Sequence, residues 1–370
     1  MHPVRVVYLV DNFWPNVGGV EVVSADLLPR LRDLGHDIVV VTDRLDDTLP
    51  AEDVYAGIQV RRLPFVPALQ AGDLDVLAQT RATVRDIVRD HDADLIHAVF
   101  LGAGVWTVPT ALKIPLIVSL HGSWPTVDWA SPTGLAGRVL ASASLVTACS
   151  QSALTDLLRA APGLADRARV VLNGRDPADP GEPLPPPPGT PLLLCVARVT
   201  PEKGLDTAVE ALTLLPEARL VVAGYGPLIP DLRQQAAELG VEDRVEFLGW
   251  VAPPAIASWM AKATVVLVPS RVEGFGLVAL EAALASRPVV ASRVGGLPEV
   301  VLDGETGLLT TPRDASAMAA AVRRLLDDRQ LAEQLGRNGR QRALECFSAS
   351  RHATEWDMLY KSVGSREPVH

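Results

Sequence analysis

The feature that most constrains the fold of this chain is the regular alternation of short apolar segments with helical segments. These apolar segments are rich in valine and leucine, and they occur at Val4–Val10, Asp37–Thr42, Leu95–Val99, Leu116–Leu120, Leu145–Ala148, Leu192–Ala197, Arg219–Ala223, Val245–Leu248, Val265–Pro269 and Val289–Ser292. Strands that are apolar throughout and separated by helices favour parallel sheets covered by helices on both faces. The sequence therefore predicts an α/β protein with doubly wound sheets.

A proline-rich stretch divides these apolar segments into two sets. It runs from Arg175 to Gly189, its composition is typical of a semi-rigid connector, and strand patterns restart directly after it. At 370 residues the chain also exceeds the usual size of a single core. We predict a boundary at Pro180–Pro191, between an N-terminal domain over residues 1–180 and a C-terminal domain over residues 190–345. The alternative is a surface loop inside one domain.

Composition excludes several classes of partner. The net charge of −10 gives no general attraction to nucleic acid or to anionic lipid, so any phosphate site must be formed locally. No apolar run reaches the roughly 18 residues of a membrane span. The three cysteines have no Cys-x-x-Cys spacing, which indicates a reduced compartment and no zinc site. We expect a cytoplasmic protein.

The stretch from Arg271 to Glu281 carries two carboxylates, Glu273 and Glu281, around a glycine-marked helix start. The predicted helix, Gly276 to Ser286, is apolar on every side except at Glu281, which is typical of a buried helix. A buried carboxylate needs a partner. That partner is either a cation from elsewhere in the fold or a pair of ligand hydroxyls, and the local sequence leaves both open.

Two cations follow the first strand of the second set. Arg198 and Lys203 lie on the predicted loop after Leu192–Ala197, where a guanidinium and an ammonium group can bind a diphosphate. Lysine accounts for only 4 of the 34 basic residues, so a lysine in a motif favours function over a solvated surface pair.

Two further candidate sites lie after predicted strands of the first set, where open parallel sheets bind ligands. Gly18 and Gly19 open a predicted helix, which suits close approach to an anion, although a plain turn explains the pair as well. His121 stands at a strand end before Gly122 and is either a cleft residue or a structural one. His36 and His97 fit structural positions.

These motifs, in this order along nearly the whole chain, resemble the retaining glycosyltransferases of family four. The matching motifs are Gly18-Gly19, His121-Gly122, Asn173-Gly174, Arg198 with Lys203-Gly204, Glu273-Gly-Phe-Gly with Glu281, Gly295-Gly-Leu-Pro-Glu299 and Asp303-Gly-x-Thr-Gly307. The resemblance implies a GT-B fold, in which two Rossmann-like domains face an interdomain cleft. It also implies that residues 346–370 form a helix returning to the N-terminal domain.

The resemblance implies specific roles for these residues. Arg198 and Lys203 would bind the donor diphosphate, Glu281 the ribose hydroxyls, and Glu273 the transferred sugar. The remaining positions expected at the site are Gly18 and Gly19 near phosphate, His121 near the sugar, Gly274, Phe275, Gly276 and Leu277 at the helix start, and, with weaker expectation, Ser150, Asn173, Tyr225 and Gly249.

Some residues depart from the family's commonest pattern. Tyr225 stands where an acidic residue is frequent, and Trp250 follows Gly249 near the expected base pocket, so the base of the nucleotide stays open. Several aromatic residues fall on first-domain loops and suggest contacts to an apolar or sugar acceptor: Phe13, Trp14, Trp124 and Trp129.

The implied activity is transfer of a hexose-type sugar, with retention, from a UDP- or GDP-linked donor to an acceptor that is a glycan, a lipid or a small metabolite. No cofactor or metal is expected, because Asp73-Leu-Asp75 and Asp92-Ala-Asp94 lack supporting metal motifs. Peripheral contact with the inner face of a membrane stays open. The rival functions are a sugar-nucleotide epimerase or hydrolase, an inactive sugar-nucleotide-binding protein, and an NAD-dependent oxidoreductase, since Gly274-x-Gly276-x-x-Ala279 loosely fits the dinucleotide motif.

Overall fold

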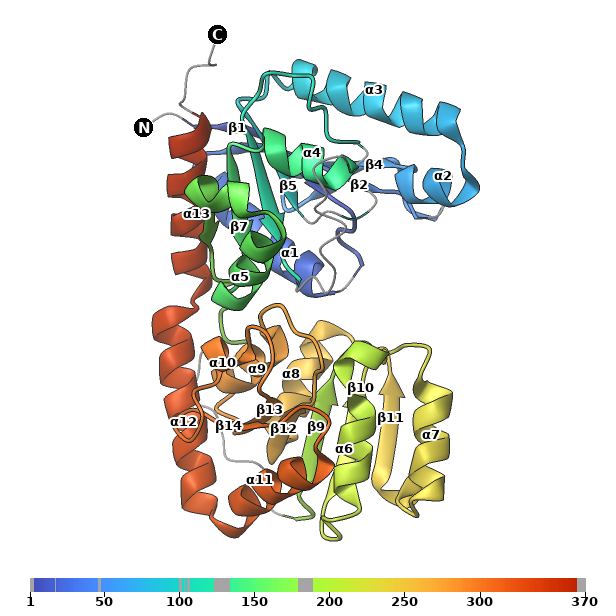
Figure 1. Ribbon diagram of the computed structural model, residues 1–370, viewed down its shortest axis with the longest axis vertical. Coiled ribbons are helices and arrows are strands. Elements are labelled where there is room, and N and C mark those ends of the chain that lie inside the picture. Colours follow the sequence, from blue (N-terminus) through green and yellow to red (C-terminus); the bar gives the residue numbers. More distant parts are fainter. Residues whose placement is uncertain are drawn as a thin grey trace. The chain divides into compact units, whose positions relative to one another are not determined.

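The computed structural model describes residues 3–16, 18–45, 48–99, 102, 104, 107–122, 134–178 and 189–364. The chain forms two compact α/β units (Figure 1). Unit 1 comprises Met1–Gly174 and Ala349–His370, and unit 2 comprises Arg175–Ser348. The chain thus first passes between units at Gly174–Arg175, ahead of the boundary expected at Pro180–Pro191. Residues 179–188 of that proline-rich stretch lie outside the described residues.

Unit 2 is built on a parallel sheet of six strands within the described residues. The strands are β9 (Leu192–Val196), β10 (Arg219–Ala223), β11 (Val245–Gly249), β12 (Val265–Val268), β13 (Val289–Ser292) and β14 (Leu308–Thr310). Their spatial order is β11-β10-β9-β12-β13-β14. The order reverses between β9 and β12, and in doubly wound sheets the ligand crevice lies at this switch point, beyond the carboxyl ends of the strands.

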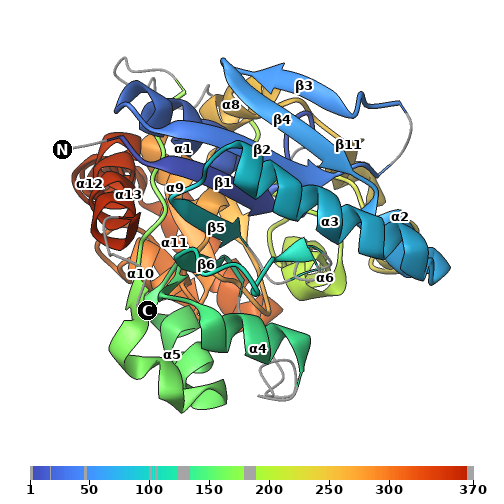
Figure 2. The ribbon, with the colours of Figure 1, turned by 90° about the horizontal axis from the view of Figure 1, so that it is seen from above.

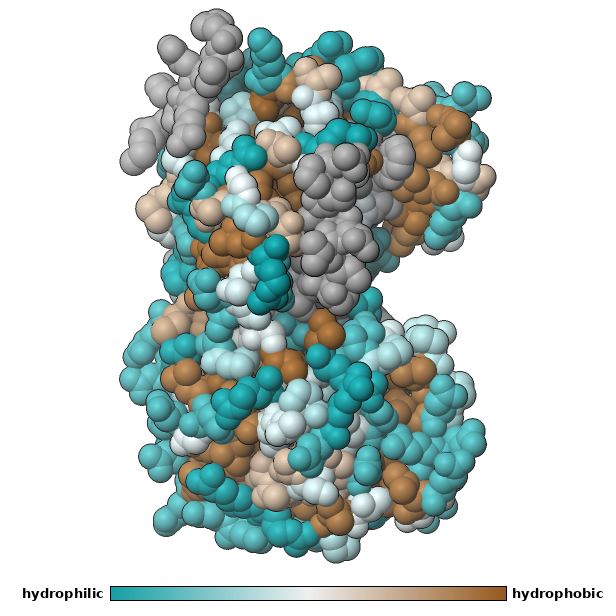
Figure 3. All heavy atoms as spheres, viewed as in Figure 1, coloured by the Kyte–Doolittle hydropathy of each residue, from teal (hydrophilic) through white to brown (hydrophobic). Residues whose placement is uncertain are grey.

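The central strands of unit 2 are apolar on both faces because helices cover both faces. Leu194, Val221 and Val266 are all fully buried, as the uninterrupted valine and leucine runs predict. The helices of this unit are α6 (Leu205–Leu212), α7 (Ile229–Glu238), α8 (Pro253–Lys262), α9 (Leu277–Leu284), α10 (Leu297–Val300), α11 (Ala315–Asp327) and α12 (Arg329–Cys346). On the face drawn in Figure 3, hydrophilic residues are spread over this unit.

Unit 1 is built on an eight-stranded sheet within the described residues. Its strands are β1 (Arg5–Val10), β2 (Asp37–Asp43), β3 (Glu52–Tyr55), β4 (Ile58–Leu63), β5 (Leu95–Val99), β6 (Leu116–Leu120), β7 (Leu145–Ala148) and β8 (Ala168–Val170). Figure 2 shows β3, β4, β2, β1, β5 and β6 following one another across this sheet. Only β3 runs antiparallel to its neighbour, so the ligand-binding edge is again the carboxyl end of the other strands.

The helices of unit 1 come from both ends of the chain. They are α1 (Gly19–Asp33), α2 (Phe65–Ala71), α3 (Leu74–Asp90), α4 (Leu135–Ser142), α5 (Gln151–Ala160) and the C-terminal helix α13 (Ala349–Gly364). Trp356 and Tyr360 of α13 are buried in the same core as the strands β1 and β5. Figure 1 shows α13 in red, and it packs against α1.

Hydrogen bonds attach α13 to the sheet of unit 1. His97 on β5 is 2.7 Å from the Tyr360 hydroxyl through Nδ1 and 2.7 Å from Ser119 Oγ through Nε2. His36 Nε2 lies 2.9 Å from Asp357 Oδ1. Both histidines are buried and hydrogen-bonded, which confirms the structural positions predicted for them.

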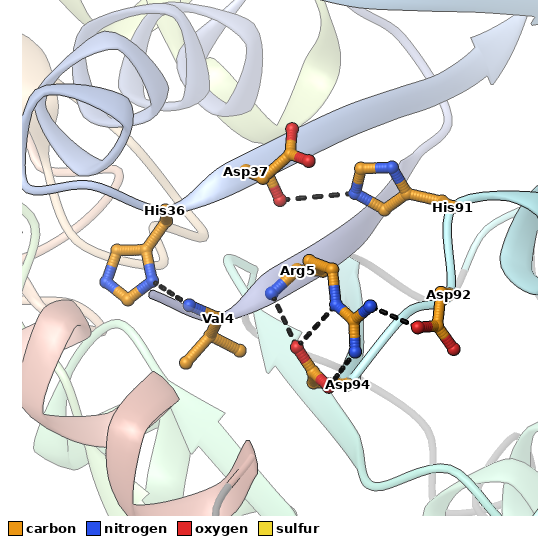
Figure 4. Close-up of polar contacts among 7 residues, drawn as sticks. All are labelled: Val4, Arg5, His36, Asp37, His91, Asp92 and Asp94. Carbon is orange, nitrogen blue, oxygen red and sulfur yellow. Dashed lines mark hydrogen bonds and ion pairs between the residues drawn. The ribbon is translucent and has the colours of Figure 1, made fainter. Parts of the chain in front are cut away.

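An ionic cluster stands at the beginning of β1, the sheet edge opposite the ligand-binding edge (Figure 4). Arg5 binds Asp94 through Nε at 3.0 Å and Nη2 at 2.7 Å, and it also pairs with Asp92. The hydrogen bonds from Arg5 hold the pKa of Asp94 below its usual value. The carboxylates of the Asp92-Ala-Asp94 sequence therefore bind a guanidinium group.

Candidate functional site

The switch point of unit 2 brings two of the predicted residues together. Lys203, from the loop after β9, places Nζ 2.9 Å from Oε2 of Glu273, from the loop after β12. The Ser270 hydroxyl donates to the same carboxylate oxygen at 3.0 Å. Both charged side chains are largely buried, with 21% and 15% of their surface exposed. Ser270 completes this cluster of three side chains. The sequence motifs do not single it out, although it directly precedes the Arg271–Glu281 stretch.

Backbone and side-chain contacts hold these two loops against each other. The Arg271 amide donates to the Glu202 carbonyl at 2.8 Å, and Arg271 Nη1 donates to the Pro201 carbonyl at 2.9 Å. The Arg271 guanidinium also pairs with Asp206 at the start of α6. The Lys203–Glu273 pair is therefore set by a rigid junction of loops.

A third loop, after β13, closes on the backbone of Glu273. The Gly296 amide donates to the Glu273 carbonyl at 3.2 Å. Gly295 has a φ of +52°, and a Cβ atom at this position would stand 1.8 Å from the same carbonyl oxygen. Only glycine therefore fits here, which gives a physical reason for the first glycine in Gly295-Gly-Leu-Pro-Glu299.

Arg198 lies on the same sheet edge but is held loosely. Its neighbours are fixed, because the Val199 amide donates to the Tyr225 carbonyl at 2.9 Å and a Cβ atom on Gly224 would stand 1.8 Å from the Ala197 carbonyl oxygen. The Arg198 side chain itself is 73% exposed, and its ion pair with Glu202 spans 3.5 Å. Such an exposed pair contributes little, so the guanidinium is available to an incoming anion.

Glu281 has a cationic partner from a distant part of the sequence. The two residues form an ion pair in which Arg175 Nη2 lies 3.2 Å from Glu281 Oε1. Of the two partners that the sequence allows for this carboxylate, the structure provides the cation. Glu281 is half-buried with 26% of its side chain exposed, and α9 spans Leu277–Leu284, which is shorter than the predicted Gly276–Ser286.

The start of α9 carries the other predicted donor-binding residues. Gly274, Phe275 and Gly276 are buried, and Gly276 is the N-cap residue of the helix. Leu277 is its first helical residue. The first amides of an α-helix lack partners within the helix and favour negative charge, so this end of α9 suits a phosphate.

In unit 1, Gly18 and Gly19 form the start of α1. Gly18 is the N-cap residue, with an extended backbone at φ −160° that any residue adopts, and Gly19 opens the helix. A Cβ atom on Gly18 would stand 2.4 Å from a carboxylate oxygen of Glu21. This oxygen is at the end of a flexible side chain that can move aside, so neither the backbone conformation nor the packing requires glycine at position 18.

His121 lies at the end of β6 and is neutral near pH 7. Burial lowers its pKa to about 4. The residue as a whole is half-buried, but its Nδ1 is shielded from solvent and has no hydrogen-bond partner among the described residues. A ring nitrogen in this condition has a hydrogen bond to offer to a ligand.

Ser150 and Asn173 lie at other strand ends of unit 1. Ser150 is fully buried and caps α5, because its hydroxyl accepts the Ala153 amide at 3.0 Å; this is a structural role. Asn173 is also buried, and its Oδ1 has no partner within the part of the chain that the structure describes.

The aromatic residues predicted on first-domain loops separate into two groups. Phe13 is buried against Tyr55, with ring centroids 5.2 Å apart, so its expected acceptor contact is wrong. Trp14 is 43% exposed. Trp124 and Trp129 lie outside the described residues.

Two aromatic side chains are exposed at the carboxyl edge of the sheet in unit 2. Tyr225 is 72% exposed beyond β10, and Trp250 is 65% exposed beyond β11, directly after Gly249. The family resemblance implies a base pocket near Gly249 and Trp250, and the flat faces of both aromatic rings suit stacking.

The described residues contain neither a metal-binding cluster nor a membrane-spanning helix. No group of three or more histidine, cysteine, aspartate or glutamate side chains there is arranged to hold a metal ion. No helix in this part of the chain has the length and hydropathy needed to cross a bilayer. Asp73, in the other Asp-x-Asp sequence, caps α3 by accepting the Val76 amide at 3.0 Å.

Comparison with known proteins identifies the family. Residues 17–179 match the family model described as Glycosyltransferase Family 4, and residues 182–342 match the model described as Glycosyl transferases group 1. The glycogen synthase of Mycobacterium tuberculosis is 32% identical over 363 residues, which cover 95% of this chain and 82% of that protein. The chain belongs to the family 4, group 1 glycosyltransferases.

Two further similarities agree with this glycosyltransferase assignment. A GDP-mannose-dependent alpha-(1-6)-phosphatidylinositol monomannoside mannosyltransferase of Mycobacterium tuberculosis is 31% identical over 383 residues, covering 91% of this chain and 93% of the relative. The structure of sucrose-phosphate synthase from Thermosynechococcus elongatus matches with a TM-score of 0.81 at 25% identity, covering 97% of this chain and 98% of that one. The two units of this glycosyltransferase are the two Rossmann-like domains of a GT-B fold.

Proposed function

We propose that this glycosyltransferase moves a hexose-type sugar from a nucleoside diphosphate-sugar to an acceptor, with retention of anomeric configuration and without a metal ion. The observation that carries the proposal is the Lys203–Glu273–Ser270 cluster at the switch point of unit 2. It places an ammonium group and a carboxylate side by side where doubly wound sheets bind their ligands. The donor would bind with its diphosphate at Lys203 and its sugar at Glu273.

The cations of unit 2 suit the donor diphosphate. An ammonium group has three donors, so Lys203 can keep its bond to Glu273 and still donate to a phosphate oxygen. Arg198 precedes Lys203 on the same loop, and its side chain is exposed. Its guanidinium can add a bidentate contact to phosphate. The start of α9 contributes helix-dipole charge of the same sign. Together these groups supply the positive charge that a metal ion supplies in other transferases.

The reaction proposed follows from where the charge develops. The bond between the anomeric carbon and the diphosphate oxygen breaks, and its electron pair goes to that oxygen. Lys203 and Arg198 stabilise the departing anion electrostatically. The acceptor hydroxyl bonds to the anomeric carbon on the same face, and its proton passes to the departing phosphate oxygen. Glu273 binds sugar hydroxyls and stabilises the oxocarbenium-like state.

The sugar of the donor is linked to UDP or GDP in this proposal. One relative is named for its dependence on GDP-mannose. Tyr225 and Trp250 offer stacking faces that accept any base. The roles of Gly18, Gly19 and His121 toward phosphate and sugar, and that of Asn173, stay predictions from the family resemblance.

A thermal-shift panel tests the donor class. The purified protein is heated with UDP, GDP, ADP, dTDP or NAD, each with and without EDTA. A nucleotide present at 100 times its dissociation constant stabilises the native state by about 2.7 kcal/mol, which raises the melting temperature. We expect one of UDP or GDP to give the largest shift, and we expect EDTA to leave that shift unchanged.

The other outcomes contradict separate parts of the proposal. A shift with NAD alone would overturn sugar transfer. A shift that EDTA abolishes and Mg²⁺ restores would overturn metal independence. Once the nucleotide is known, consumption of the matching sugar nucleotide at the same rate with and without a panel of acceptors would indicate a hydrolase or an epimerase instead of a transferase.

A further inference from the structure

Arg175 forms an ion pair with Glu281, the carboxylate that is predicted to bind the ribose, and the sequence motifs assign Arg175 no role. We propose that Arg175 is a positioning residue, whose guanidinium orients Glu281 so that this carboxylate accepts the hydroxyls of the nucleotide ribose. The inference rests on the proposed function, because it requires a ribonucleotide donor. In this role Arg175 sets the discrimination between ribose and deoxyribose.

The contact itself is the first support. Arg175 Nη2 lies 3.2 Å from Glu281 Oε1, and the two side chains are 21% and 26% exposed. Partial burial makes an ion pair stronger than a surface pair, while the remaining exposure leaves room for a ligand. A carboxylate has two oxygens with about four acceptor positions, so one guanidinium bond is compatible with further bonds to hydroxyl groups.

The backbone of Arg175 is anchored to the segment that carries Glu281. Its amide donates to the Phe347 carbonyl at 2.8 Å. The Phe347 ring packs edge-on against Phe275, with centroids 5.6 Å apart, and Phe275 belongs to the same Glu273–Glu281 stretch. The guanidinium of Arg342 lies over the Phe347 ring, 5.4 Å from its centroid. Arg175 thus lies outside the Glu273–Glu281 stretch in the sequence but is connected to it through Phe347 and Phe275.

Charge explains why such a residue is useful. The donor brings a diphosphate to the start of α9, and Glu281 is itself an anion on that helix. No other residue of α9 (Leu277–Leu284) is charged, so the helix cannot compensate Glu281. Arg175 offsets this negative charge. It also restricts a side chain that would otherwise lose rotamer freedom on binding.

Binding of matched nucleotide pairs tests the inference. Titration calorimetry measures the Kd of UDP against 2′-deoxy-UDP, with the GDP and ADP pairs in parallel, for the wild type, Arg175→Met, Arg175→Lys and Glu281→Gln. A hydrogen bond to a charged group is worth roughly 10- to 100-fold in affinity, so the wild type should prefer the ribonucleotide by at least about tenfold. Arg175→Met should reduce this ratio to about threefold or less, and Arg175→Lys should retain part of it.

A matched control separates orientation from general stability. Arg219→Met removes another arginine of unit 2 that pairs with a glutamate, Glu246, at 3.7 Å, at the opposite end of the strands. This variant should keep the wild-type ratio. Melting curves for all variants show whether each one folds. If Arg175→Met does not fold, the nucleotide ratio of Arg175→Lys serves as the test.

Each contrary result has a distinct meaning. If Arg175→Met leaves the ratio of the deoxyribonucleotide Kd to the ribonucleotide Kd at its wild-type value, whether or not both affinities fall, Arg175 does not orient Glu281. The inference then fails while the donor assignment stands. If Glu281→Gln keeps the wild-type ratio, Glu281 does not bind the ribose and the inference fails with that assignment. If the wild type binds none of these nucleotides, the proposed function fails as well.

Discussion

At the scale of single residues, the two carboxylates of the Glu273–Glu281 stretch obtain their positive charge from different segments. Glu273 pairs with Lys203 across the switch point, and Glu281 pairs with Arg175 from the first residues of unit 2. The sequence predicts that an anion on an apolar helix needs a partner, but Arg175 is 106 residues away, so local spacing cannot identify it. Its one sequence signal is that it directly follows the Asn173-Gly174 motif.

Removing either partner of the Lys203–Glu273 pair should lower the rate of transfer strongly and the stability of the fold only slightly. We expect Lys203→Ala and Glu273→Ala each to lower kcat/KM by about 100- to 1000-fold, the usual effect of deleting one group that stabilises transition-state charge. Circular dichroism melts and a donor-consumption assay measure the two effects separately.

A second lysine of the same unit provides the control for this pair of variants. Lys262, at the end of α8, lies over the Trp259 ring at 5.1 Å, and Lys262→Ala should keep its activity. Wild-type-like turnover in Lys203→Ala or Glu273→Ala would remove those residues from the proposed mechanism. A melting temperature that falls as far as activity does would assign them a structural role.

At the scale of elements, the site depends on three loops whose backbones touch. The loops after β9 and β12 are joined by the Arg271–Glu202 contact, and the loop after β13 reaches the Glu273 carbonyl through Gly296. Such close approach leaves no room for side chains at the contact point. The position of Glu273 is therefore a property of the junction as much as of its own strand.

Gly295→Ala should displace Glu273. The added methyl would stand 1.8 Å from the Glu273 carbonyl oxygen, so the backbone must move in addition to the cost of a positive φ. We expect a loss of stability of about 2–4 kcal/mol and a loss of most activity. Urea denaturation and the donor assay measure these two quantities.

Gly304→Ala isolates the steric part of this effect. Gly304 also has a positive φ, +76°, but a Cβ atom there meets nothing within 4 Å. Its alanine variant should lose only about 1 kcal/mol and keep activity. Equal losses in the two variants would show that backbone conformation alone, and not the contact with Glu273, accounts for Gly295.

The elements that the sequence predicts well are those buried on both faces. The segments Leu95–Val99, Leu116–Leu120, Leu145–Ala148, Arg219–Ala223 and Val289–Ser292 match β5, β6, β7, β10 and β13 to the residue. The strands β3, β4, β8 and β14 are absent from the prediction. They are short or lie near a sheet edge, and β3 and β4 alternate in exposure, so they have no continuous apolar run.

The candidate site is predicted less completely than the fold, for a related reason. Motif spacing indicates that Lys203 and Glu273 follow strands of one sheet, and parallel strands place such residues at one edge. It does not indicate side-chain partners from outside the motifs, such as Ser270, nor that Ser150 is occupied as a helix cap. Such details depend on packing and not on pattern.

At the scale of the whole molecule, the histidines divide unequally between the units. All seven histidines fall within the residues of unit 1. Burial lowers the pKa of His121 to about 4 and that of His352 to about 3, and it lowers the pKa of His97 well below its usual value. For His352, Nε2 accepts the indole N–H of Trp356 at 2.9 Å, a bond that protonation there would remove.

Mild acid should therefore weaken unit 1 before unit 2. A histidine whose folded pKa is depressed contributes stability that is present above its unfolded pKa of about 6.5 and is lost as the pH falls toward the folded value. Asp43 acts in the opposite direction. Burial raises its pKa to about 6, so its protonation recovers some stability over the same range. Three histidines against one aspartate leave a net loss between pH 6.5 and 5.

Hydrogen exchange followed by mass spectrometry at pH 7 and pH 5, corrected for the intrinsic rates, measures this in each unit. Peptides from β1, β5 and α13 should lose protection at pH 5, while peptides from β9 and β12 serve as the internal control. A pKa difference of one unit corresponds to about 1.4 kcal/mol, so the change in β1, β5 and α13 should be measurable. Equal loss in both units, or earlier loss in unit 2, would contradict the expectation.

The placement of α13 in the core of unit 1 has a consequence for how the protein is made. A ribosome releases the chain from its N-terminus, so residues 1–174 emerge first, yet their core lacks Trp356 and Tyr360 until the final helix has been synthesised. Unit 2 is one continuous segment, complete at Ser348. The unit that is translated second can therefore finish folding before the unit whose synthesis begins first.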